Sequence, residues 1–323
     1  MLKYSNFDLK IEEYMLYCSS RNLSPKTLKS YETTLKLFSN YLVKEHTVDD
    51  VEDVTKNHIR HYVKFLQERG KYTCMEEKGN NKPSARTDFG KPISVNTINN
   101  YVRNIKVFFN WLADEDEIEK NPMLKIKLLK GSERIKAMLS EKEIKSILNS
   151  FNKTIFNEYR NYIITLVILD TGCRISECLE IKVDDVNLTN QVVVLRYTKN
   201  KKERPVFFSP KLKKELNQWL KYKDRYMTND LLFPTNRGTL LAINLYEKAL
   251  RKIGNELKIE LYPHKLRANF AQYYLLNGGD ILTLSRILGH SNLEVTKVYL
   301  QFDDESVNRQ YQKFSPLNGL NLR

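Results

Sequence analysis

Residues 263–299 alternate helix starts with helix stops. Pro263 suits the first turn of a helix, where its missing N–H has no intrahelical partner, and Gly278 lies where that helix should end. Asp280 is a favourable N-cap for a second helix, and Gly289 can end it in the left-handed conformation. These signals predict a series of short helices.

A third helix is expected to begin in Ser291-Asn292-Leu293-Glu294, where Ser and Glu three positions apart form a capping box. His290 therefore falls in the turn between two helices. Tyr299 is expected on the third helix, about 12 Å along the axis from Ser291 at ~1.5 Å per residue.

Helical patterns also dominate the N-terminal part of the chain, up to about residue 115. Ser24-Pro25 is a helix start, and a second helix is expected from Val95 to Leu112. One β signal stands out further on: Val192–Tyr197 and Pro205–Phe208 flank a lysine-rich turn and predict a hairpin. The fold class is therefore mainly α with a small β-hairpin or sheet, an α+β arrangement.

The chain length predicts two domains. We expect a helical domain over 1–118, a basic linker over 119–137 and a second domain over 138–323, opened by a capping box at Ser140 and Glu143. Residues 68–92 show no periodicity, and this long loop is either a tolerated insertion or an arm that orders on DNA.

Charge favours a polyanionic partner. The net charge is +14 and the sequence pI about 9.4. Residues 182–225 hold twelve Lys/Arg and five Asp/Glu, so half of the net charge lies there, in a cluster that suits phosphate contacts. With no membrane-spanning stretch and no signal-peptide run at the N-terminus, we expect a cytoplasmic protein. The four cysteines are scattered, which favours reduced thiols over a disulfide or metal framework.

Several polar residues could be ordinary helix decoration when each is considered alone. His264 and Arg267, three apart, are neighbours on one helix face, and the apolar residues of that helix should leave them on the rim of the core. Arg174 follows a break at Gly172, where Glu177, one turn on, could hold its guanidinium.

Their order in the sequence is more informative. The series Arg174, Lys199, His264-x-x-Arg267, His290, Tyr299 closely resembles the tyrosine recombinase (phage integrase) family, and its Xer-like members in particular. The matching stretches are Thr171-Gly172-Cys173-Arg174-Ile175-Ser176-Glu177, His264-Lys265-Leu266-Arg267, and Leu288-Gly289-His290-Ser291 followed by Tyr299. The lysine hairpin Thr198–Arg204 departs from the family pattern because both glycines are replaced, so Lys201 and Lys202 remain alternatives to Lys199.

The resemblance implies a SAM-like core-binding domain followed by a catalytic domain that acts on double-stranded DNA at paired recombination sites. It implies that Tyr299 attacks the scissile phosphate to give a 3′-phosphotyrosine, with no cofactor or metal. Arg174 and Arg267 would hold the non-bridging oxygens, and Lys199 would protonate the leaving oxygen. His264 would exchange a proton with the nucleophile, and His290 would bond a phosphate oxygen.

By the same resemblance, residues 306–314 are expected to dock on a neighbouring subunit in a homotetramer, or else to pack on their own subunit. No arm-binding domain is expected before Leu9, which favours a simple recombinase. Integration, excision and resolution of a mobile element, plasmid or chromosome dimer all remain open. The competing functions are a type IB topoisomerase, which shares this chemistry, and a DNA-binding regulator without catalysis.

Overall fold

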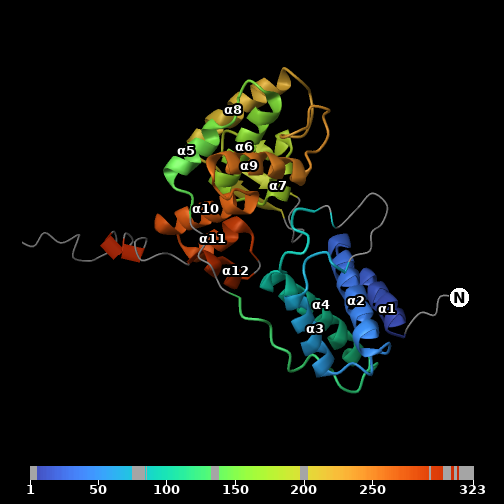
Figure 1. The fold of residues 1–323 in the computed structure, drawn as a ribbon. Coiled ribbons are helices and arrows are strands. Elements are labelled where there is room, and N and C mark those ends of the chain that lie inside the picture. Colours follow the sequence, from blue (N-terminus) through green and yellow to red (C-terminus); the bar gives the residue numbers. More distant parts are fainter. Residues whose placement is uncertain are drawn as a thin grey trace, which may run out of the picture. The chain divides into compact units, whose positions relative to one another are not determined.

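A computed structural model describes residues 6–74, 84, 86–131, 138–196, 203–290, 292–300, 307–308 and 311–312. The chain divides into two compact units, Met1–Glu133 and Arg134–Arg323, each with its own core. The described part is mostly helical with one small sheet, which confirms the predicted fold class (Figure 1). Within this part no helix is long and apolar enough to cross a membrane.

The first unit is built from four helices: α1 (Asn6–Ser20), α2 (Pro25–His46), α3 (Lys56–Glu68) and α4 (Val95–Asp114). The N-cap of α2 is Ser24, whose hydroxyl accepts the Thr27 N–H, as the Ser-Pro pair predicts. Aromatic rings fill the core between the helices, including Phe7, Phe38 and Phe108, all fully buried.

Hydrogen bonds to backbone groups hold both the long loop over residues 68–92 and the basic segment after α4. An antiparallel bridge joins Gly70 to Pro92 at the base of the long loop, of which residues 75–83 and 85 lie outside the description. After α4, the side chain of Asn99 pairs with the backbone N–H and carbonyl of Leu129 at 2.9 Å each. The basic segment therefore packs on the first unit as far as Leu129.

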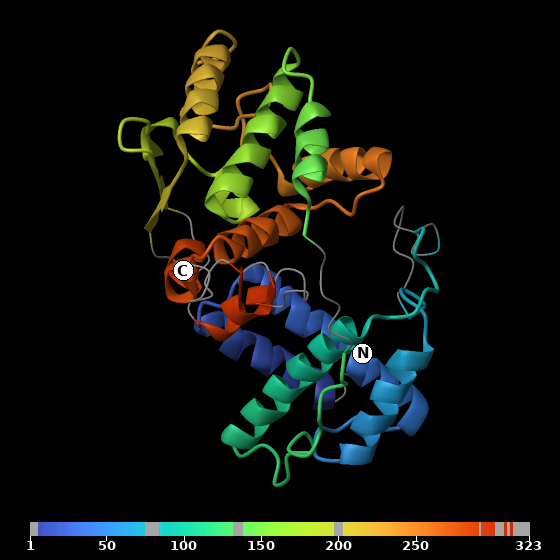
Figure 2. The same ribbon diagram turned by 90° about the vertical axis from the view of Figure 1, so that its left-hand side faces the viewer.

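The second unit carries the remaining described helices around a core centred on α6. They are α5 (Glu141–Asn149), α6 (Phe156–Thr171), α7 (Ile175–Leu179), α8 (Pro210–Asp224), α9 (Ile243–Leu257), α10 (Pro263–Leu276), α11 (Ile281–Leu288) and α12 (Glu294–Lys297), with 3-10 turns η2 (Val183–Asp185) and η3 (Val298–Leu300). Helix α10 packs directly against α6 (Figures 1 and 2). The capping box predicted at Ser140 is present at the start of α5.

The predicted hairpin is also present, within a three-stranded antiparallel sheet. Strands β2 (Val192–Leu195) and β3 (Arg204–Phe207) pair in a register that sets Leu195 opposite Arg204, and β1 (Val186–Asn187) extends the sheet beside β2. Strand β1 was not predicted, since two residues are too few to show alternation. The hairpin tip, residues 197–202, lies outside the described residues.

The end of the helical series differs from the prediction. Asp280 caps α11 by accepting the N–H groups of Leu282 and Thr283, and Gly289 ends it at φ 64°, as predicted. The third helix, however, is only four residues long, and Tyr299 lies on the 3-10 turn η3 that follows it. Ser291 lies outside the description, and the oxygen that accepts the Glu294 N–H is Oδ1 of Asn292.

Candidate active site

Arg174 is held at the break between α6 and α7. Gly172 ends α6 at φ 65°, and a Cβ there would lie 2.3 Å from the Phe270 ring, so only glycine fits. Arg174 then caps α7, and Glu177 accepts both its backbone N–H and its Nη1, at 2.8 Å each. The prediction that Glu177 holds the Arg174 guanidinium is confirmed.

Arg267 is buried, with 3% of its surface exposed, and not on the rim of the core as predicted. Its Nη1 donates to the Gly172 carbonyl at 2.7 Å, and its Nη2 donates to the Leu288 carbonyl and to Nε2 of His290 at 2.9 Å each. The rim prediction is wrong because α10 packs on both α6 and α11, whose ends cover this face of the helix.

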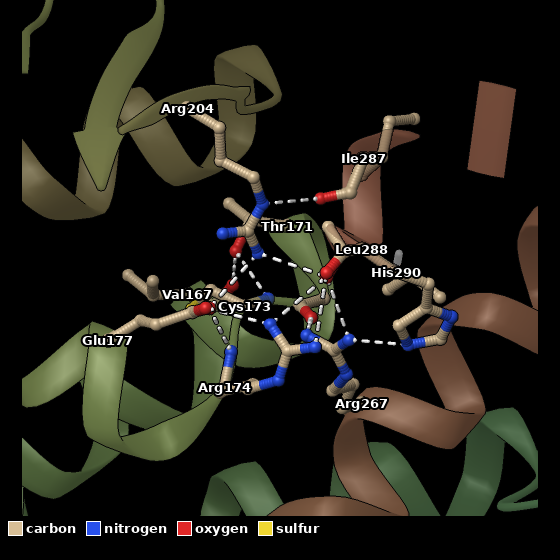
Figure 3. Close-up of polar contacts among 12 residues, drawn as sticks. Val167, Thr171, Cys173, Arg174, Glu177, Arg204, Arg267, Ile287, Leu288 and His290 are labelled. Atoms are coloured by element: carbon tan, nitrogen blue, oxygen red, sulfur yellow. Dashed lines mark hydrogen bonds and ion pairs between the residues drawn. The ribbon is translucent and has the colours of Figure 1, made fainter. Parts of the chain in front are cut away.

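The C-terminal end of α11 is the point where three guanidiniums converge (Figure 3). The Leu288 carbonyl accepts from Arg267 at 2.9 Å, from Arg204 at 3.3 Å and from Arg174 at 3.4 Å. The carbonyls that end a helix lack intrahelical partners and carry partial negative charge, so cations stabilise them.

Arg204, the first residue of β3, was not among the predicted site residues. It donates from Nη2 to Glu177 at 3.0 Å and from Nε to the Ile287 carbonyl at 3.1 Å (Figure 3). Its place at the end of the Lys-rich hairpin motif was a visible signal, but nothing in the sequence indicated that it reaches α11.

Glu177 joins two of the arginines through its carboxylate, whose side chain is fully buried. Burial alone would raise the pKa of this carboxyl, but hydrogen bonds from Arg204 and Arg174 outweigh it and hold the pKa below its ordinary value. Burial, together with the charge of Arg174, lowers the pKa of Arg267. Three guanidiniums and one carboxylate leave a positive cluster, which suits one phosphodiester group.

His290 follows Gly289 in the turn, as predicted, and lies between two hydrogen-bonding partners. Its Nε2 faces Arg267 at 2.9 Å and its Nδ1 faces the Thr296 hydroxyl at 2.8 Å. Burial and the charges of Arg267 and Arg174 lower the pKa of His290 to about 4, so the ring is neutral near pH 7.

Tyr299 lies beside His290, with the two rings near parallel and their centroids 6.3 Å apart. Its side chain is buried, with 7% of the residue exposed. The structure therefore brings Arg174, Arg267, His290 and Tyr299 together from separate elements.

The other two predicted site residues, His264 and Lys199, are not among the residues that the structure describes in this buried cluster. His264 is exposed in the first turn of α10, close enough for its charge to contribute to the low pKa of His290. Lys199 lies outside the described residues, on the hairpin whose strands end at Leu195 and begin again at Arg204.

Potential metal ligands form no cluster in the described ranges. No group of three or more His, Cys, Asp or Glu residues there could hold a metal ion. All four cysteines are free thiols; Cys18, Cys173 and Cys178 are buried and Cys74 is exposed.

Two family models match the sequence. The model of the phage integrase N-terminal SAM-like domain matches residues 11–119, and the phage integrase family model matches residues 137–306.

Curated relatives match over nearly the whole chain. Tyrosine recombinase XerA of Saccharolobus solfataricus is 30% identical over 288 residues, which cover 89% of this chain and 86% of the relative. Tyrosine recombinase XerD of Listeria innocua is 24% identical over 303 residues, which cover 92% of this chain and 94% of the relative.

Solved structures share the fold. The integrase of transposon Tn1549, in complex with a circular intermediate DNA, superposes with a TM-score of 0.72 at 18% identity, covering 94% of this chain and 99% of that one. The XerH site-specific recombinase, bound to its difH substrate before cleavage, gives 0.65 at 21% identity, covering 94% and 83%.

Proposed function

The chain belongs to the phage integrase family, and we propose that it is a site-specific recombinase that cleaves and rejoins double-stranded DNA through a 3′-phosphotyrosine. The resemblance inferred from the motifs is thereby confirmed. The observation that carries the proposal is a cluster of three arginines and a neutral histidine beside a buried tyrosine.

The geometry supports a transesterification. The Tyr299 hydroxyl would attack the scissile phosphorus, forming an O–P bond as the bond to the 5′-oxygen breaks. Because the energy of the phosphodiester is conserved in the covalent intermediate, rejoining needs no ATP. Arg174 and Arg267 would offset the charge on the non-bridging oxygens, and losing one such donor typically slows the reaction by about 10²–10³.

The proton transfers complete the scheme. Lys199 would protonate the leaving 5′-oxygen, and His264 would exchange a proton with the Tyr299 phenol. His290, held against Arg267, would bond a non-bridging oxygen of the phosphate. No residue in this scheme requires a metal or an organic cofactor.

The partner we propose is double-stranded DNA that carries paired recombination sites, in the cytoplasm. Residues 1–118 would form the core-binding domain, 119–137 the linker and 138–323 the catalytic domain. A homotetramer would form through residues 306–314. Within this range the structure describes only residues 307–308 and 311–312. The reaction would be integration, excision or resolution of a mobile element, plasmid or chromosome dimer; a transposon integrase is among the proteins that share the fold.

The test is trapping of the covalent adduct on a nicked suicide substrate made from the DNA that flanks the gene. The natural enzyme should become covalently attached to DNA, and Tyr299→Phe should bind the site but form no adduct. The matched control is Tyr226→Phe, an exposed tyrosine two residues after the end of α8, which should form adducts at the natural rate.

Two results would contradict the proposal. Adduct formation by Tyr299→Phe would exclude that residue as the nucleophile. Relaxation of any plasmid by a monomer, without a synapse of two sites, would favour a type IB topoisomerase instead.

A further inference from the structure

The hydrogen bonds of His290 determine which ring nitrogen carries its proton. The Arg267 guanidinium has only donors, so the nitrogen that faces it, Nε2, must accept. In a neutral ring the proton is then on Nδ1. It is donated to the Thr296 hydroxyl oxygen, 2.8 Å away.

Thr296 is placed to do this by α12. It is the third residue of that short helix, and it is fully buried. Its backbone N–H donates to the Leu293 carbonyl at 2.8 Å, which anchors the residue on the turn that leads to Tyr299. The helix therefore presents one buried hydroxyl to the imidazole ring.

We propose that Thr296 is a positioning residue for the recombination reaction: its hydroxyl fixes the orientation and the Nδ1-protonated form of His290. This inference rests on the proposed function, because it concerns the ring that meets the scissile phosphate. Residues behind a ligand often set its tautomer and orientation in this way, as they do for histidines that bind metals.

The same contact also serves the charged ring. In an imidazolium both nitrogens donate, so a proton added at Nε2 leaves the bond from Nδ1 to Thr296 intact. When the Arg267 N–H turns to the phosphate, Nε2 is released as an acceptor. It can then take up a proton from solvent and donate to a phosphate oxygen, with the ring still held at Nδ1. Without the hydroxyl, a ring protonated at Nδ1 would have a buried N–H that lacks this acceptor. A ring protonated at Nε2 would instead place its N–H against the N–H of Arg267.

The first experiment reads the tautomer directly by ¹⁵N NMR of histidine-labelled, full-length protein without DNA. The chain has five histidines, and comparison with His290→Asn assigns the signal. We expect a protonated Nδ1 and an unprotonated Nε2 in the natural protein and in Thr296→Ser. In Thr296→Val a large fraction of the ring should be protonated at Nε2. An unchanged ring in Thr296→Val would overturn the inference.

The second experiment measures single-turnover cleavage of the suicide substrate. Thr296→Val should cleave about tenfold more slowly, with site binding unchanged, and Thr296→Ser should restore the rate. The control is Thr165→Val, which removes another fully buried hydroxyl with a 2.8 Å bond, to Tyr246, and should cleave normally.

A double-mutant cycle separates positioning from packing. Adding Thr296→Val to His290→Asn should slow cleavage no further if Thr296 acts through His290. A full additional tenfold loss would mean a structural role and overturn the inference. Should the natural enzyme form no adduct at all, the proposed function fails, while the NMR result still tests the link between Thr296 and His290.

Discussion

Glu177 is the residue that most clearly shows how the site is balanced. Its buried carboxylate accepts from the side chains of Arg174 and Arg204, at 2.8 and 3.0 Å. Two guanidiniums so close together would repel each other without a negative charge between them. A residue that touches no substrate in the proposed mechanism thus keeps the arginine cluster together.

Glu177→Gln should therefore lower the free energy of unfolding by about 3 kcal/mol at pH 7, because it leaves buried arginine charge without its partner. The low folded pKa of Glu177 means that its contribution is present above pH ~4.5 and is lost as the pH falls through the folded pKa. The difference between the natural protein and the variant, measured by urea unfolding, should accordingly shrink in acid.

The matched control is Glu294→Gln on α12. That carboxylate also pairs with a cation, Lys297, but its side chain is 68% exposed, so the loss should stay below about 1 kcal/mol. Equal losses for the two variants would show that burial does not set the strength of the Glu177 pairs.

At the scale of elements, the end of α11 organises the site. Gly289 ends the helix in the left-handed conformation, and the chain then turns so that His290 follows immediately. A Cβ at position 289 would lie 2.8 Å from Nε of Arg204, so any residue larger than glycine must displace the side chain that binds the helix end. The left-handed cap at Gly289 and the arginine cluster therefore depend on each other.

Gly289→Ala should destabilise the protein by about 1–2 kcal/mol, from the left-handed backbone and the contact with Arg204. It should also slow DNA cleavage, since Arg204 must move. Gly131→Ala serves as the comparison, because the nearest atom to its added Cβ would be 3.8 Å away and its backbone is not left-handed. Thermal unfolding of both variants tests this; equal melting temperatures would contradict it.

Elements with local signals could be predicted from the sequence. The caps at Ser24, Ser140 and Asp280 and the stop at Gly289 are set by residues within a few positions of each other, and all four are confirmed. Arg174 with Glu177 is equally local. Catalytic roles came only with the family pattern, and they remain proposals.

What the sequence could not provide depends on packing between distant segments. Arg267 is buried because α10 packs against both α6 and α11. The two carbonyls that accept from it, those of Gly172 and Leu288, lie 95 and 21 residues away in the sequence. Arg204 reaches Leu288 across 84 residues and Glu177 across 27. Helix α12 is only four residues long, so Tyr299 lies on a 3-10 turn. The predicted capping box indicates where a helix begins but not how long it is.

At the scale of the whole molecule, two separately cored units carry a net charge of +14. A protein of this charge should bind DNA with a strong dependence on salt, because each neutralised phosphate releases counterions. The hairpin tip concentrates three lysines within four positions, Lys199, Lys201 and Lys202, next to the arginine cluster in sequence.

Replacing these three lysines with glutamine should reduce the slope of log affinity against log salt by about 0.9 for each lysine that contacts a phosphate. Lys153→Gln should leave the slope unchanged, since that lysine already lies over the Tyr162 ring and 3.5 Å from Glu215. Fluorescence anisotropy over a salt series measures both. An unchanged slope for the triple variant would exclude the hairpin tip from the DNA contact.

The carbonyls at the end of α11 have one more consequence, which concerns preorganisation. Long side chains such as arginine lose up to about 2 kcal/mol of rotamer entropy when they are fixed. Here Arg174, Arg204 and Arg267 are already fixed by bonds to Leu288, so this loss belongs to folding and not to DNA binding. In the proposed mechanism an entering phosphate would meet guanidinium donors that are already positioned, so the reorganisation needed to reach the transition state would be small.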